Sequence, residues 1–115
     1  MHELSIAQSV VEIVRQHLPD DRPVKVNAVR IRLGELSGIV PDSLEFCFSA
    51  IVAGTSLEGA TLMMERVPLT ARCADCGATS AIDQSIFACP ACGGSALQIT
   101  TGREMNVVAI DVDDL

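Results

Sequence analysis

Two closely spaced cysteine pairs constrain this 115-residue chain more than any other feature of its sequence. The pairs are Cys73-Ala-Asp-Cys76 and Cys89-Pro-Ala-Cys92, separated by residues 77–88, and each is followed directly by glycine, Gly77 or Gly93. Two turns that each present two thiolates to one ion predict a tetrahedral four-cysteine zinc site, and the glycines relieve the positive φ that such turns require. A pair of thioredoxin-like redox motifs is the alternative, but a redox motif needs neither the second pair nor the glycines.

The predicted zinc site is structural, because four thiolates leave no coordination position for water or substrate. It replaces a hydrophobic core that about thirty residues cannot build alone. Nucleic-acid binding lacks support, since Lys and Arg total 8 against 15 Asp and Glu, for a net charge of -7. We therefore expect the zinc module to contact protein.

Charge and hydropathy also bear on the compartment. No apolar run approaches the roughly 18 residues needed to span a bilayer, and the N-terminus has an acidic residue at position 3 instead of a basic leader. We expect a cytoplasmic protein without membrane contact. Five cysteines in a reducing compartment fit four metal ligands and one spare thiol better than disulfides.

The remaining sequence predicts an α+β fold. Apolar residues at spacings of three and four indicate a helix that ends near Leu18, with a stripe made of Leu4, Ala7, Val10, Val11, Val14 and Leu18. Pro41–Val52 reads as a second helix, with Pro41 in its first turn, a capping-box-like spacing of Asp42 and Glu45, and Cys47 on the apolar face. We interpret Cys47 as a small core residue and His17 as a surface residue at a helix end.

Alternating apolar and polar residues predict strands at 24–36, 61–67 and 105–112, the first with a bulge or twist near Asn27. The cysteine-bearing stretch, about 70–102, lies between the last two strands. The predicted architecture is a small two-helix, roughly three-stranded domain into which a four-cysteine, zinc-ribbon-like domain is inserted.

The first three residues, Met1-His2-Glu3, form a second candidate metal site. A histidine at position 2 can chelate one ion through the terminal amine, its own amide nitrogen and its imidazole, with the Glu3 amide or carboxylate next in line. Copper(II) and nickel(II) favour such planar nitrogen sets, whereas zinc does not.

Taken in order, these motifs resemble the hydrogenase nickel incorporation protein HypA family. The resemblance spans essentially the whole chain. It rests on Met1-His2-Glu3 at the start of a helix, on Leu33-Gly-Glu-Leu-Ser-Gly38 followed by Val40-Pro-Asp-Ser-Leu-Glu-Phe46, and on the paired cysteines.

The resemblance implies a nickel metallochaperone with two domains. Residues 1–69 plus 103–115 would bind Ni(II) through His2, with main-chain nitrogens of Met1, His2 and Glu3 and the Glu3 carboxylate as a further candidate ligand. Residues 70–102 would bind Zn(II) through Cys73, Cys76, Cys89 and Cys92. Histidines that flank the zinc cysteines in some relatives have no counterpart in residues 70–102.

The resemblance also implies partners: a GTPase and the large subunit of NiFe hydrogenase, with urease maturation proteins in some relatives. The chain itself would be a monomer or a weak homodimer. It contains no phosphate-binding glycine-lysine motif, so a nucleotide-driven step would belong to the partner.

Two other functions compete with this interpretation. In the first, the chain is a zinc-ribbon adaptor that docks a partner and has no nickel function. In the second it is an enzyme, either a zinc hydrolase or a thiol oxidoreductase. The enzyme is disfavoured because the two histidines, His2 and His17, fall near opposite ends of one predicted helix and the four-cysteine site is saturated.

Overall fold

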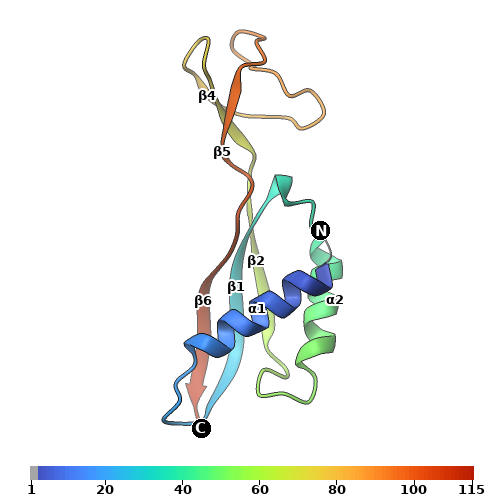
Figure 1. The fold of residues 1–115 in the computed structure, drawn as a ribbon, viewed down its shortest axis with the longest axis vertical. Helices are drawn as coiled ribbons and strands as arrows, with labels where there is room; N and C mark the ends of the chain where they lie inside the picture. Colours follow the sequence, from blue (N-terminus) through green and yellow to red (C-terminus); the bar gives the residue numbers. More distant parts are fainter. Residues whose placement is uncertain (1–2) are drawn as a thin grey trace. The chain divides into compact units, whose positions relative to one another are not determined.

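The structure, a computed structural model, describes residues 3–115 and has the predicted α+β architecture. Its elements in chain order are α1 (Glu3–His17), β1 (Val24–Gly34), the 3-10 turn η1 (Glu35–Ser37), α2 (Pro41–Val52), β2 (Thr61–Val67), β3 (Thr70–Cys73), β4 (Thr79–Ala81), β5 (Leu97–Thr101) and β6 (Met105–Asp114) (Figure 1). The chain forms two compact units. The first holds residues 3–32, 38–65 and 106–115, and the second holds Leu33–Ser37 and Arg66–Met105.

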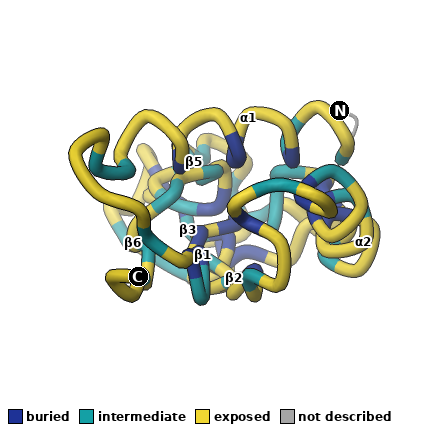
Figure 2. Tube along the Cα trace, turned by 90° about the horizontal axis from the view of Figure 1, so that it is seen from below, coloured by how far each residue is buried: buried dark blue, intermediate teal, exposed yellow. Residues whose placement is uncertain are grey.

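The first unit is a layer of two helices on a three-stranded sheet of order β2-β1-β6. In Figure 2 the buried positions of α1 lie on the side of the helix that faces the strands. Its core is built from aliphatic residues and one phenylalanine: Ala7, Val10, Val11, Val14, Val26, Val29, Ile31, Leu44, Phe48, Val52, Leu57 and Leu62. The three strands and two helices predicted for this part of the chain are confirmed.

Helix α1 follows from its apolar spacing, since the residues buried on it are Ala7, Val10, Val11 and Val14. Leu4 was expected on the same stripe, but its side chain is 47% exposed. The stripe therefore begins one turn later than the spacing predicts, because burial of the first turn depends on the elements packed beside it and not on periodicity alone.

Helix α2 begins with Pro41 in its first turn, as predicted, because proline lacks an N–H that this turn would leave unpaired. The predicted capping box is wrong. Val40 is the N-cap residue and no side chain caps the helix. Leu44, Phe48 and Val52 are buried, while Cys47 is half-buried, so this thiol lies at the margin of the core and not inside it.

Strand β1 ends at Gly34, two residues earlier than the predicted end at Leu36, and continues as η1. Its buried positions change parity between Val26 and Val29, near the irregularity predicted at Asn27. Glu35 and Leu36 lie in η1, where Glu35 contacts Leu69 and Leu36 packs against the core of the second unit.

The second unit is built on a small sheet of order β4-β3-β5, whose three strands were not predicted individually. Strand β3 pairs antiparallel with both neighbours, with Ala71 opposite Ser80 on one side and Ile99 on the other. A small core of Leu69, Ala71 and Ile82 covers the sheet, with Leu36, Leu97 and Ile99 packed against it.

Residues 33–37 are an integral part of this second unit. The amide of Gly34 donates to the carbonyl of Glu104 at 2.9 Å, and that of Leu36 donates to the carbonyl of Gly102 at 2.7 Å. The carboxylate of Glu35 accepts from the amide of Leu69 at 3.2 Å. A segment that precedes α2 in the sequence therefore completes the fold of the cysteine-bearing unit.

Within residues 3–115, no helix has the length and apolar character needed to cross a membrane.

Candidate metal centre

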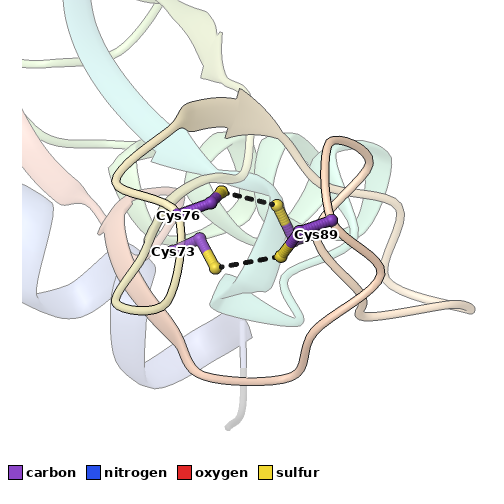
Figure 3. Close-up of side chains that lie close together, drawn as sticks. Cys73, Cys76 and Cys89 are labelled. Carbon is purple, nitrogen blue, oxygen red and sulfur yellow. Dashed lines mark hydrogen bonds between the residues drawn. The ribbon is translucent and has the colours of Figure 1, made fainter.

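The second unit brings all four paired cysteines together. The sulfur atoms of Cys73, Cys76, Cys89 and Cys92 lie within 4.8 Å of one another. The Sγ atoms of Cys73 and Cys92 are 3.6 Å apart. Those of Cys76 and Cys89 are also 3.6 Å apart, and Figure 3 shows Cys73, Cys76 and Cys89 pointing toward one another. A tetrahedral ion with Zn–S bonds of about 2.3 Å separates its sulfur ligands by roughly 3.8 Å, so this spacing fits a four-coordinate zinc ion.

Each cysteine pair lies on a turn of the same construction. The carbonyl oxygen of Cys73 accepts a hydrogen bond from the amide of Gly77 at 2.8 Å, and Cys89 accepts one from Gly93 at the same distance. Both glycines have φ of +75°, in the left-handed region that a residue with a Cβ enters only at a cost. The sequence prediction that glycine relieves positive φ after each pair is therefore confirmed.

The two turns also bury one thiol each. Cys73 and Cys89, the first members of the pairs, are buried, whereas Cys76 and Cys92 are exposed. The amide of Cys73 donates to the Ala78 carbonyl at 2.9 Å, and the amide of Cys89 donates to the Gly94 carbonyl at 2.8 Å. These bonds close both turns and hold the buried thiols in place. Gly94 is tightly packed here, because a Cβ built on it would lie 3.1 Å from a carboxylate oxygen of Asp75.

Hydrogen bonding shifts the pKa values of three of the thiols, Cys76, Cys89 and Cys92, in different directions. The backbone amides of Cys92 and Ala91 lower the pKa of Cys89 to about 7. The amide of Gly94 lowers the pKa of Cys92, but its hydrogen bonds to Cys73 and Cys89 outweigh this and raise that pKa to about 12. The Cys89 thiolate therefore forms readily near neutral pH, whereas the pKa values of Cys76 and Cys92 are raised and these two thiols resist ionisation. A divalent cation at the centre removes this resistance, because it binds the thiolate form of each ligand.

The donor set also limits the chemistry. Four thiolates around one ion leave no position for a substrate, and the half-buried Cys47 of the first unit contributes nothing to the cluster. A zinc ion held by these four cysteines would cross-link the two turns and would carry no catalytic water.

The predicted nickel ligands lie at the other end of the sequence. Met1 and His2 are outside the described residues, and Glu3 is the first residue of α1. Glu3 lines a shallow hollow of the first unit together with Leu4, Asp42, Ser43, Phe46 and Cys47. The other histidine, His17, has its Nδ1 atom 2.8 Å from the carbonyl oxygen of Ile13 and is exposed in the last turn of α1, which agrees with the surface role predicted for it.

Sequence reasoning missed Glu35 and Leu36 as parts of the cysteine-bearing unit. The side chain of Gln84, on the segment between the two cysteine pairs, donates to the carbonyl oxygen of Glu35 at 3.1 Å. The sequence feature that could have indicated this contribution is the Leu33–Gly38 motif. It lies outside both metal motifs, and its pattern alone indicates only the end of a strand.

A family model described as hydrogenase/urease nickel incorporation, metallochaperone, hypA, matches residues 1–112. The chain belongs to the HypA family. The hydrogenase maturation factor HypA of Geotalea uraniireducens is 46% identical over 98% of this chain and 100% of its own length. The HypA of Streptomyces avermitilis is 43% identical, over 99% of this chain and 88% of its own.

Solved HypA structures share the fold. The solution structure of the nickel metallochaperone HypA from Helicobacter pylori matches with a TM-score of 0.67 and 21% identity, and covers 96% of this chain and 97% of that one. Membership of the HypA family places the chain among maturation factors for nickel incorporation and not among enzymes.

Proposed function

We propose that this chain binds Ni(II) at its N-terminus through His2 and delivers it during the maturation of NiFe hydrogenase. The observation that carries the proposal is the pairing of HypA family membership over residues 1–112 with a separate, closed four-cysteine cluster. In this proposal the cluster binds zinc in a structural role, so the transported metal binds elsewhere.

His2 is the principal ligand in this proposal, with main-chain nitrogens of Met1, His2 and Glu3 in the coordination plane and the Glu3 carboxylate as a further candidate ligand. A site of few side chains suits transfer, because an acceptor can displace its ligands one at a time. Affinity order alone favours copper(II) over nickel(II), so metal availability and the docked partner supply the remaining selectivity.

We assign nickel to residues 1–69 plus 103–115 and zinc to residues 70–102. The second compact unit, residues 33–37 and 66–105, supports a separate zinc module with wider bounds than this assignment. The partners in this proposal are a GTPase, which supplies the nucleotide-driven step, and the hydrogenase large subunit, which accepts the metal. Urease maturation proteins are further candidate partners.

Metal analysis of the purified, untagged protein tests the proposal. One zinc per chain is expected after purification, and titration should add one nickel with the absorption of a planar nickel(II) centre. Protein that takes up zinc alone would instead be the zinc-ribbon adaptor, without a nickel function.

A further inference from the structure

The apolar residues of β6 are only partly covered. This strand is an edge of its sheet, because in the order β2-β1-β6 it pairs with β1 alone among the described strands (Figure 1). The central strand β1 buries Val26, Val29 and Ile31 completely. In contrast, none of the 10 residues of β6 is buried, although most of them are apolar: Met105, Val107, Val108, Ala109, Ile110 and Val112. The edge therefore exposes apolar surface that a further element could cover.

A shallow groove borders this edge. It has a volume of about 320 Å³ and is lined by two residues of α1 and four of β6: Ile13, His17, Val107, Val108, Ala109 and Ile110. The side chains of Ile13 and Val108 are 36% and 41% exposed. A strand added to β6 would lie next to both of them. The groove and the unpaired edge thus form one surface.

The edge of β6 lacks the residues that usually prevent pairing with another chain. Proteins protect exposed edges with charged residues, with proline or with very short strands. Residues 105–110 contain no charged residue, proline or glycine, and β6 is longer than the usual five or six residues. The other edge, β2, is shorter and carries Glu65 and Arg66, and the Glu65 carboxylate lies 3.6 Å from the Arg32 guanidinium. Within this sheet, β6 is the unprotected edge.

The charges of β6 decide which direction of pairing is favourable. Its acidic residues, Asp111, Asp113 and Asp114, all lie in the C-terminal half of the strand. Parallel pairing of two copies would place these carboxylates beside one another, which is destabilising. Antiparallel pairing sets the acidic half of each strand against the uncharged half of the other. The sequence of β6 is therefore complementary to itself in the antiparallel direction.

A two-fold axis through Val108 keeps like charges apart beyond the strand as well. Val108 is exposed and lies within the uncharged half, so two copies can approach there without opposing charges. Within one chain Arg22 already pairs with Asp114 at 2.7 Å, which fixes the acidic end of the strand. Counting outward from the axis, every acidic residue faces an uncharged or basic one, in the pairs Asp111–Met105, Val112–Glu104, Asp113–Arg103 and Asp114–Gly102.

We infer that β6 pairs antiparallel with β6 of a second copy of this chain, joining the two three-stranded sheets into one. Main-chain hydrogen bonds across the edge supply the contact, and burial of the groove residues adds to its affinity. A contact of this kind is isologous, because the same strand is used by both copies. The two-fold axis is perpendicular to the sheet, so the helices of both copies lie on the same face. The pairing uses no cysteine of the cluster and no residue proposed to bind nickel.

The first test measures self-association of the untagged, zinc-loaded full chain by sedimentation equilibrium. The variant is Val108→Lys, which sets two lysines opposite each other at the axis. Like charges directly opposite each other disfavour pairing, and edge lysines block it. The matched control is Met63→Lys on the other edge strand, β2, where the methionine is 44% exposed. We expect a wild-type dimer whose Kd rises about tenfold or more in Val108→Lys and is unchanged in Met63→Lys.

The second test is a cross-link that reports the register and does not depend on the lysine variant. In a Cys47→Ser background, Val108→Cys places one thiol directly opposite its copy, at a Cβ separation of about 4.5–5.5 Å. Oxidised glutathione should convert this protein to a disulfide-linked dimer on a non-reducing gel. The control Met63→Cys should remain monomeric on the same gel. Bound zinc protects the four cluster thiols during the oxidation.

Several results would overturn the inference. Wild-type protein that stays monomeric at millimolar concentration excludes the pairing, and so does a Val108→Lys protein that is folded and dimerises like the wild type. If Val108→Lys does not fold, absence of the Val108→Cys cross-link decides against the pairing. A monomeric wild type that binds a strand of another protein at β6 would assign the edge to that protein instead. Nickel and zinc uptake should be equal in wild type and Val108→Lys, so failure of the proposed nickel function leaves this test unaffected.

Discussion

Gly34→Ala should be among the most destabilising single methyl additions in the second unit. A Cβ built on Gly34 would lie 2.1 Å from the carbonyl oxygen of Gly102 and 2.7 Å from the amide nitrogen of Arg103. These neighbours are backbone atoms and cannot turn aside as the end of a flexible side chain could. The two segments must separate locally to admit the methyl group.

The size of the loss in stability depends on the packing and the hydrogen bonds that this separation disturbs. Inserting a methyl group into a packed site costs about 1–3 kcal/mol. Separation also weakens the hydrogen bonds from Gly34 to Glu104 and from Leu36 to Gly102, which contribute about 1 kcal/mol each. We expect Gly34→Ala to lower the free energy of unfolding by about 3–5 kcal/mol.

Gly59→Ala is the matched control, because it adds the same methyl group where nothing lies within 4 Å. Its φ of +83° imposes only the cost of a left-handed alanine, about 1 kcal/mol. Urea denaturation of both variants, zinc-loaded and followed by circular dichroism, measures the difference. Gly34→Ala protein as stable as Gly59→Ala protein would show that the close approach at Gly102 is not maintained in solution.

Four further predictions concern the metals. The double variant Cys73→Ser/Cys76→Ser should lose zinc, and its second unit should unfold while the helical circular dichroism of the first unit largely persists. The control variant Cys47→Ser should keep one zinc per chain, as measured by metal analysis. His2→Ala should abolish nickel binding and hydrogenase maturation yet change stability by less than about 0.5 kcal/mol in thermal unfolding, since a terminal side chain contributes little packing; an unfolded variant, or normal maturation, would contradict the proposed ligand. A Gly-Ser extension before Met1 should weaken nickel binding at unchanged zinc content, because it converts the amine proposed as a ligand into an amide. Wild-type nickel affinity should rise as pH increases through about 7.7–8.0, the range in which that amine deprotonates, and an identical nickel spectrum and affinity in the extended protein would exclude the amine as a ligand.

The sequence predicts those parts of the fold that depend on local pattern. Pro41 and the apolar spacing after it predict both ends of α2, and the two cysteine pairs with their glycines predict both turns of the cluster. These signals act over a few residues, where backbone geometry and side-chain chemistry decide the outcome.

The features that were missed depend on contacts between distant residues. Leu36 alternates correctly with its neighbours for a strand, yet the chain turns at Glu35 because the Leu69 amide and the Gln84 side chain lie beside it. Leu4 has the right spacing for burial but no element covers it fully. Strand β4 has only three residues and β5 alternates over only five, so neither stands out in the sequence, and pairing with β3 defines them.

The contribution of residues 33–37 to the second unit limits how this metal module can be moved between proteins. A gene fragment that encodes residues 66–105 alone would lack Leu36 and the Glu35 carboxylate, and would expose one side of the Leu69, Ala71 and Ile82 cluster to water. The fragment 66–105 is therefore not expected to fold as an independent domain when it is moved into another protein. A working graft would need a second, separate segment from the host, placed to supply the same leucine and carboxylate.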